Sequence, residues 1–219
     1  MDKGKLIVIE SGTDGSGKTT QFNKLYGKLK EKNYPVHKVE FPDYASDSSA
    51  LVKMYLQGDF GEDPSEVNLY AASTFFAVDR FVSYQKKWQS FYREGKTILA
   101  DRYTTSNMIH QASKISDKEE KEEYLSWLRD LEFVKFQLPI PDLVIFLDMP
   151  PEYSVQLLKK RGNQDIHERD VRYLTRTYRN ALEIAREYGW SIISCIDQGE
   201  IKPVEEIHRE VYTLVKKII

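Results

Sequence analysis

The sequence has little cysteine or histidine and no long apolar run. Its single cysteine, Cys195, cannot form an internal disulfide, and its place in the run WSIISCI favours a small buried hydrophobic residue. The four histidines lie far apart, so their spacing indicates no zinc site. No uninterrupted apolar stretch approaches the roughly 18 residues of a membrane span, and no basic-then-apolar leader is found. We therefore expect a protein of the reducing cytoplasm that has no membrane partner.

An excess of charge of one sign is also missing. The chain has 32 basic and 34 acidic residues and a net charge of −2 at pH 7, so no overall field would draw it to nucleic acid. Its hydrophobic fraction of 41% and charged fraction of 30% are those of an ordinary globular protein. A length of 219 residues predicts a single domain over residues 1–219 that is large enough to bury a core.

Short apolar runs alternate with helix-like segments along the chain. Strands are predicted at 5–10, 35–41, 97–101, 142–148 and 190–196. Helices are predicted at about 18–32, 48–57, 66–94 and 203–218, and another after a cap at Ser116. This alternation predicts an α/β fold, with a five-stranded parallel sheet and helices on both faces. Ligands of such sheets bind at the carboxyl ends of the strands, which is where the polar motifs of this sequence lie.

The first predicted strand leads into a glycine-rich stretch with the spacing of a phosphate-binding loop, Gly12-x-x-x-x-Gly17-Lys18-Thr19. The glycines let backbone N–H groups turn toward phosphate oxygens, and the next helix adds its positive N-terminal end. Lys18 would reach the β- and γ-phosphates of ATP or GTP, and the Thr19 hydroxyl would bind Mg²⁺. No guanine-selective N-K-x-D motif is found. The residues predicted to bind the nucleotide phosphates are Gly12, Thr13, Asp14, Gly15, Ser16, Gly17, Lys18, Thr19 and Thr20.

Several motifs together resemble those of the thymidylate kinase family, within the P-loop nucleoside monophosphate kinases. They are GTDGSGKTTQ (12–21), FP (41–42), FFAVDR (75–80), DRYTTSNMIHQ (101–111) and PDLVIFLDMPPE (141–152). The resemblance implies a P-loop NTPase-type three-layer fold and, as a rule, a homodimer. It also implies a Mg²⁺-dependent, direct in-line transfer of the γ-phosphoryl of ATP to dTMP, which gives dTDP and ADP for dTTP biosynthesis.

The resemblance also implies an acceptor pocket. Phe76 matches the aromatic residue that stacks on the thymine ring, and Arg80 matches a hydrogen-bond donor to the base. Arg102 matches the arginine that binds the acceptor phosphate, for which a planar guanidinium is suited. Asn107 matches a position that reads the pyrimidine edge. The other predicted pocket residues are Phe41, Pro42, His110 and Gln111.

Two acidic residues are expected near the reacting phosphates. Asp14 matches the loop acid near the sugar 3′-hydroxyl and a metal-bound water. Asp101 has two open interpretations, which are ordering Mg²⁺ through water and orienting Arg102. The expected metal-site residues are Thr19 and Asp101, and the expected catalytic residues are Lys18, Asp14, Arg102 and Arg161.

The family resemblance implies the catalytic role of Arg161 because the phosphate loop has glycine at Gly15. Some relatives supply a cation from the loop position of Gly15, whereas those with glycine there supply it from a mobile lid. The stretch 159–170 is the expected lid, because it is basic and lies between two predicted helices. Arg161 is its first candidate for the transition-state cation, followed by Lys160 and Arg169.

Three positions depart from the family pattern near the acceptor. Tyr44 stands where many relatives have an arginine, and His110 replaces a tyrosine. Ser11 takes the place of the usual glutamate, although Glu10 stands one residue earlier. These departures leave another deoxynucleoside monophosphate open as the acceptor. Two further alternatives are a deoxynucleoside kinase, against which the DRY sequence at 101–103 argues, and a non-catalytic nucleotide-binding regulatory module.

Overall fold

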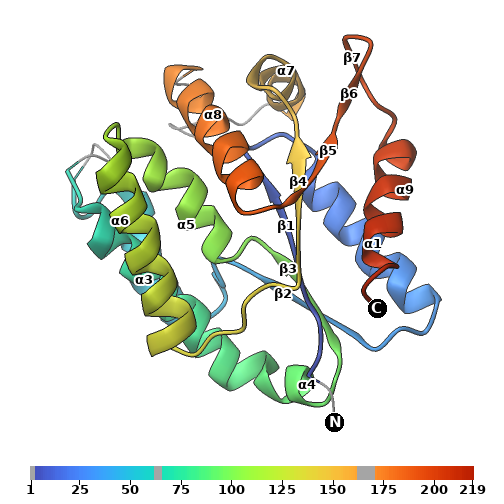
Figure 1. The fold of residues 1–219 in the computed structure, drawn as a ribbon, viewed down its shortest axis with the longest axis horizontal. Coiled ribbons are helices and arrows are strands. Elements are labelled where there is room, and N and C mark those ends of the chain that lie inside the picture. Colours follow the sequence, from blue (N-terminus) through green and yellow to red (C-terminus); the bar gives the residue numbers. More distant parts are fainter. Residues whose placement is uncertain (1–2, 62–65, 162–170) are drawn as a thin grey trace.

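The computed structural model describes residues 3–61, 66–161 and 171–219 and has a parallel sheet at its centre (Figure 1). The sheet order is β2-β3-β1-β4-β5, and every neighbouring pair is parallel. Its strands are β1 (Leu6–Ser11), β2 (Val36–Glu40), β3 (Thr97–Asp101), β4 (Leu143–Asp148) and β5 (Ser191–Ser194). The predicted five-stranded α/β fold is therefore confirmed.

The central strand β1 is buried along its whole length because helices cover both faces of the sheet. Leu6 and Val8 belong to one hydrophobic cluster, and Ile7 and Ile9 belong to another. Successive side chains of a strand point to opposite faces, so this alternation assigns one cluster to each face. It also explains why the first four residues of β1, Leu6 to Ile9, are continuously apolar.

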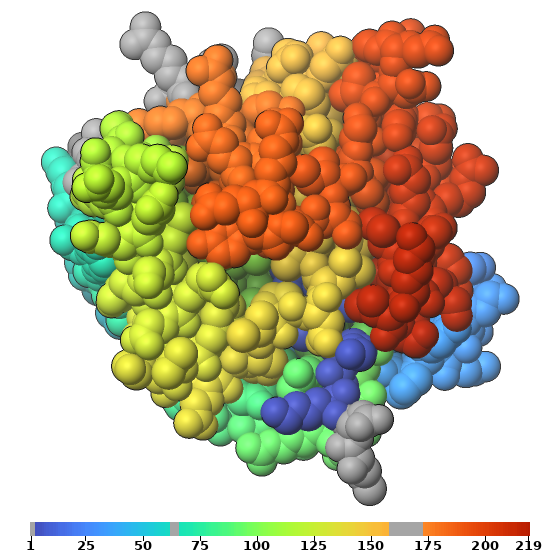
Figure 2. All heavy atoms as spheres, viewed as in Figure 1, coloured from blue at the N-terminus to red at the C-terminus, as the bar shows by residue number. Residues whose placement is uncertain are grey.

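Two helices pack together over the Ile7 face. They are α1 (Lys18–Glu31) and α9 (Val204–Val215), whose apolar side chains join in one cluster. Figure 1 places the two helices side by side, and Figure 2 shows α9 packed against the N-terminal part of the chain. The first and last predicted helices are thus confirmed and brought together.

The remaining helices form the other layer and the upper edge of the molecule in Figure 1. They are α2 (Ala50–Gln57), α3 (Leu69–Ser83), α4 (Gln89–Arg93), α5 (Thr104–His110), α6 (Lys118–Arg129), α7 (Pro151–Arg161) and α8 (Val171–Glu187). Among the described residues, no helix is both long and apolar enough to cross a membrane.

The structure corrects three details of the sequence prediction. The predicted helix at 66–94 is interrupted by a π-helical turn, Tyr84–Trp88, that separates α3 from α4. The predicted strand at 190–196 splits after Ser194, and a short ribbon of β6 (Ile196–Asp197) and β7 (Glu200–Ile201) follows. The N-cap of α6 is Asp117, not Ser116, because the Asp117 carboxylate accepts a hydrogen bond from the Glu120 N–H at 2.9 Å.

The strand order places two loops next to each other at the carboxyl ends of the strands. In the parallel ladder Ile9 lies opposite Asp101, so the segment after β1 begins beside the segment after β3. The order also reverses at β1, which has β3 on one side and β4 on the other. Such a reversal is the usual ligand-binding position in open parallel sheets.

Cys195 provides a test of the packing at the end of β5. Its side chain is buried in the cluster beneath α1 and α9, as its apolar surroundings predict. Burial raises the pKa of the Cys195 thiol to about 12, so the reactive thiolate is scarce at neutral pH.

We therefore expect iodoacetamide to leave Cys195 unmodified in the native protein at pH 8 and to alkylate it fully in urea. Intact-protein mass spectrometry gives the measurement. Rapid alkylation of the native protein would contradict this packing.

Candidate active site

The phosphate loop connects β1 to α1 in a backbone conformation that requires glycine. Gly15 has φ 77° and Gly17 has φ 82°, and both lie in the left-handed region. Gly12 faces α8, where an added Cβ would come within 3.2 Å of Tyr178 and Ala181. The loop ends at Lys18, the first residue of α1, whose N-terminal N–H groups face an incoming anion.

Lys18 is buried at the base of this loop, where its ammonium group pairs with the Asp101 carboxylate. Burial lowers the pKa of Lys18; the charge of Arg102 lowers it further, and the charge of Asp101 opposes both effects. Neither open interpretation of Asp101 anticipated this pairing. The pair keeps the lysine charge at the position where the loop would receive phosphate.

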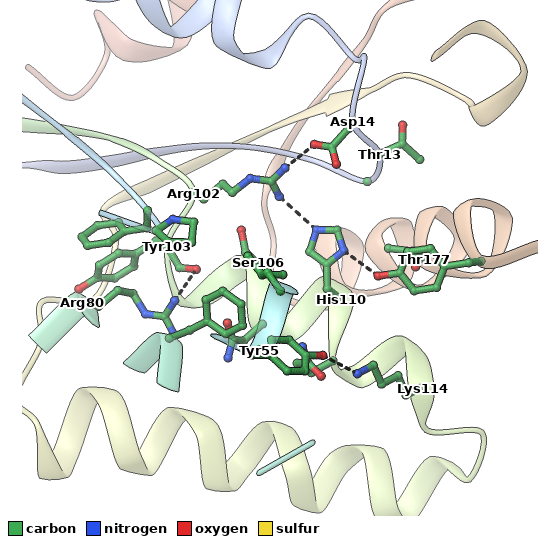
Figure 3. Close-up of a pocket in the computed structure, with 18 of the residues that line it drawn as sticks. Thr13, Asp14, Tyr55, Arg80, Arg102, Tyr103, Ser106, His110, Lys114 and Thr177 are labelled. Atoms are coloured by element: carbon green, nitrogen blue, oxygen red, sulfur yellow. Dashed lines mark hydrogen bonds and ion pairs between the residues drawn. The ribbon is translucent and has the colours of Figure 1, made fainter. Parts of the chain in front are cut away.

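Arg102 lies beside the loop, immediately after β3, with φ 67°. A left-handed backbone is uncommon for a residue with a side chain and is often found at functional sites. Its Nη2 donates to Asp14 Oδ1 at 2.6 Å, and its Nη1 lies 3.1 Å from His110 Nε2 (Figure 3). The guanidinium group is thus bound to the phosphate loop on one side and to α5 on the other.

Arg102 and Asp14 form an ion pair in which each charge stabilises the other. The Arg102 guanidinium holds the pKa of Asp14 below its usual range, although burial alone would raise it. Burial opposes the Arg102 charge, but Asp14, Glu10 and Asp101 outweigh it, so the pKa of Arg102 is raised. Both groups are therefore ionised throughout the neutral pH range.

Two cavities meet at this arginine. One, of about 270 Å³, follows the phosphate loop from Asp14 to Thr19. The other, of about 230 Å³, extends toward α3, α5 and α8. The residues that line both are Asp14, Phe41, Pro42, Tyr44 and Arg102. A molecule in either cavity would therefore reach the same guanidinium group.

All the residues that the family resemblance assigns to the acceptor pocket line the second cavity, which we call the acceptor cavity after that prediction. They are Phe41, Pro42, Phe76, Arg80, Arg102, Asn107, His110 and Gln111. Most of the predicted phosphate-binding residues line the first cavity instead. Of the others, Gly12 and Thr13 line the acceptor cavity, and Thr20 lies on α1 outside both cavities.

Aromatic side chains form one wall of the acceptor cavity. Tyr55 of α2 meets Phe76 of α3 edge-on, with ring centroids 6.1 Å apart. Lys114 donates a hydrogen bond to the Tyr55 hydroxyl at 3.1 Å (Figure 3). The sequence prediction missed Tyr55 and Lys114, because nothing in their local sequence indicates that α2 lies across from the 3-10 turn Ala112–Lys114 after α5.

Arg80 reaches the cavity from a fully buried position. Its guanidinium Nε and Nη2 donate to the two oxygens of Glu132 at 2.7 and 2.5 Å. The Thr104 hydroxyl also donates to Glu132, at 2.6 Å. Arg80 is 1% exposed and Glu132 is 0% exposed, so this bidentate ion pair lies inside the protein. Glu132 was also missed, because a pairing across 52 residues leaves no local pattern.

Polar groups of α5 complete the cavity. The Asn107 amide nitrogen donates to the Ser73 carbonyl at 3.3 Å, which fixes the amide orientation. Gln111 is buried, and its Oε1 accepts no hydrogen bond from the described residues. A buried acceptor of this kind is costly unless a ligand or water supplies a donor.

Glu10 of β1 positions this helix. Its Oε1 accepts hydrogen bonds from the hydroxyls of Thr105 and Ser106 in the first turn of α5, at 2.7 and 2.6 Å. A carboxylate is favourable there because the N-terminal end of a helix is positive. Ser11, which replaces the expected glutamate, donates to the Thr13 carbonyl at 3.0 Å and so stabilises the loop.

Comparison with known proteins identifies the family of this chain. A family model described as thymidylate kinase matches residues 9–211. The chain belongs to the thymidylate kinase family. A probable thymidylate kinase of Pyrococcus horikoshii is 30% identical over 214 residues, which cover 98% of this chain and 97% of the relative. A thymidylate kinase of Mycobacterium tuberculosis is 30% identical over 192 residues, with 84% and 87% covered. The resemblance inferred from the motifs is confirmed, and the chain is a nucleoside monophosphate kinase by family.

The donor groups at the phosphate loop fit the magnesium ion that such kinases use. Thr19 and Asp101 supply oxygen donors beside the loop. Among the described residues, no group of three or more His, Cys, Asp or Glu side chains could hold a metal ion. The two oxygen donors suit Mg²⁺, which keeps several waters and binds through one or two protein groups and nucleotide phosphates.

The predicted lid lies almost entirely outside the described residues. Residues 162–170, which include Arg169, are not described, and the side chains of Lys160 and Arg161 at the end of α7 are not described either. The role of Arg161 therefore stays a prediction from the family resemblance.

The buried Arg80–Glu132 pair gives a stability prediction. Glu132→Ala leaves the arginine charge buried without its partner, which should lower the free energy of unfolding by roughly 3–5 kcal/mol. Urea denaturation measures the change. Glu94→Ala is the matched control, because it removes an ion pair with Lys96 from the surface, where the loss should stay below about 1 kcal/mol. Equal effects of the two substitutions would contradict the account of the buried pair.

Proposed function

We propose that this protein transfers the γ-phosphoryl group of ATP to dTMP, giving ADP and dTDP in dTTP biosynthesis, with Mg²⁺. The observation that carries the proposal is the junction of the two cavities at Asp14, Tyr44 and Arg102. A donor nucleotide along the phosphate loop and a monophosphate in the acceptor cavity would bring their phosphates together there. Such positioning supplies much of the catalysis in phosphoryl transfer.

The transfer itself would be direct. An oxygen of the acceptor phosphate attacks the γ-phosphorus, the bond from this phosphorus to the β–γ bridging oxygen breaks, and ADP leaves with the electron pair. Lys18 would stabilise charge on the donor phosphates, and Arg102 would bind the acceptor phosphate. Thr19 and Asp101 would hold Mg²⁺, and the ion would supply charge neutralisation at the phosphates. No covalent enzyme intermediate is needed.

The far end of the acceptor cavity is suited to a pyrimidine. Phe76 offers a ring face on which a flat base can stack. Arg80, Asn107 and Gln111 present polar atoms around it, and Glu132 and Ser73 fix the first two of these side chains. Polar groups of fixed orientation discriminate between bases more strongly than apolar contact does.

Tyr44 and Arg161 complete the proposal for the reacting groups. Tyr44, at the shared rim of the cavities, can donate one hydrogen bond but brings no positive charge. Arg102 therefore carries more of the acceptor-phosphate binding than in relatives with arginine there. We assign the transition-state cation to Arg161, and we propose a homodimer in the cytoplasm, both by analogy with the family.

A panel of acceptors tests the proposed substrate. With ATP and Mg²⁺, we expect ADP release to be fastest with dTMP among dTMP, dUMP, UMP, dCMP, dGMP, dAMP and thymidine. A coupled ADP assay measures the rates. Preference for another monophosphate would contradict dTMP as the substrate, and turnover of thymidine in place of dTMP would contradict the acceptor-phosphate site at Arg102.

Lys18→Ala tests the phosphate loop. Loss of one positioned cation should lower kcat by roughly 100-fold or more, because its interaction is strongest in the transition state. Lys24→Ala is the control, since this α1 lysine pairs with Glu205 at the surface, away from both cavities. A Lys18→Ala enzyme with the kcat of the control would contradict the assigned role.

A further inference from the structure

His110 of α5 departs from the family pattern, and it contacts the acceptor arginine directly. Its Nε2 lies 3.1 Å from Arg102 Nη1, and its Nδ1 lies 3.5 Å from the hydroxyl of Tyr173 on α8 (Figure 3). On its other side, Arg102 donates to Asp14 at 2.6 Å. Arg102 therefore lies between a carboxylate of the phosphate loop and an imidazole of the acceptor cavity.

The chemistry of this contact determines the tautomer of His110. A guanidinium group has N–H donors and no acceptor, so Nε2 must be the acceptor. A neutral imidazole that accepts at Nε2 carries its proton on Nδ1. The Nδ1–H then donates to the Tyr173 hydroxyl oxygen, and the protonated imidazolium could not make the contact with Arg102.

We propose that neutral His110 is a positioning residue that orients the Arg102 guanidinium toward the acceptor phosphate without cancelling its charge. This inference rests on the proposed function. Because two separate elements bind the two terminal nitrogens, the planar group cannot rotate about the Asp14 contact alone. The remaining N–H groups of the guanidinium stay available to a phosphate at the junction of the cavities.

Neutrality of the second partner is the essential point. Asp14 already balances the single charge of Arg102. A second carboxylate at position 110 would place a further negative charge beside Arg102 and would repel an acceptor phosphate dianion. An imidazole acceptor supplies the same hydrogen bond and leaves the electrostatic balance unchanged.

Three substitutions at position 110 separate orientation from charge. His110→Gln keeps a neutral acceptor, His110→Phe removes the acceptor and keeps an aromatic ring, and His110→Glu keeps an acceptor but adds negative charge. We expect KM for dTMP to rise about tenfold in His110→Phe, the effect of losing one hydrogen bond to a charged group. The rise should be larger in His110→Glu and less than about threefold in His110→Gln, and KM for ATP should change less than about twofold in all three.

The proposal is overturned if His110→Phe leaves KM for dTMP unchanged, if His110→Gln is as impaired as His110→Phe, or if KM for ATP rises equally. Binding of thymidine by calorimetry is the control for packing. Thymidine has no phosphate for Arg102, so its affinity should be the same in wild type and His110→Phe, and a matching loss would assign His110 to the base or sugar.

The tautomer gives a readout that needs no turnover. Imidazole ¹⁵N NMR of the unliganded protein at pH 8, assigned by the signal that His110→Gln lacks, should show the proton of His110 on Nδ1. A proton on Nε2, or on both nitrogens, would overturn the proposal. If the wild type does not phosphorylate dTMP but shows the Nδ1–H tautomer, the substrate assignment fails while the Arg102–His110 arrangement stands.

Discussion

The parallel pairing of β1 with β3 is the constraint on which the rest of the site depends. Because Ile9 lies opposite Asp101, the phosphate loop and the DRY segment leave the sheet side by side. Because these two segments are adjacent, Asp101 contacts Lys18 and Arg102 contacts Asp14, although 83 and 88 residues separate the members of these pairs. The two cavities meet at Arg102 for the same reason.

In the described part of the chain, three cations that line the two cavities each have an anionic partner. Lys18 pairs with Asp101, Arg80 with Glu132, and Arg102 with Asp14. Charges in a partly buried site are unfavourable without partners, so these pairs let the protein fold with the three cations in place. Bound donor and acceptor phosphates would then either add to these ion pairs or replace the carboxylate partner in them.

The sequence could predict those parts of the molecule that have a local pattern. Gly12 to Thr19 follow the spacing of a phosphate loop between a strand and a helix, and the five apolar runs correctly give the five strands. The residues predicted for the acceptor pocket line one cavity, although their roles stay predictions. The π-helical turn at Tyr84–Trp88 was not predictable, since the apolar pattern continues through it.

The sequence could not predict side-chain contacts between residues that lie far apart in the chain. Glu132 lies in a segment rich in charge, and only the fold shows that its carboxylate is buried against Arg80. The contact of His110 with Arg102 likewise depends on the helical conformation of α5, which ends at His110, and on the left-handed backbone at Arg102. Side-chain partners that join different elements were therefore found only in the structure.

The central claim is that donor and acceptor occupy two cavities joined at Arg102. The most direct test is calorimetric binding of one ligand that spans both, adenosine and thymidine joined 5′ to 5′ through a chain of phosphates. We predict that one equivalent per chain binds more tightly than ATP or dTMP and excludes both of them. A ligand that displaces only one of the two nucleotides would contradict it.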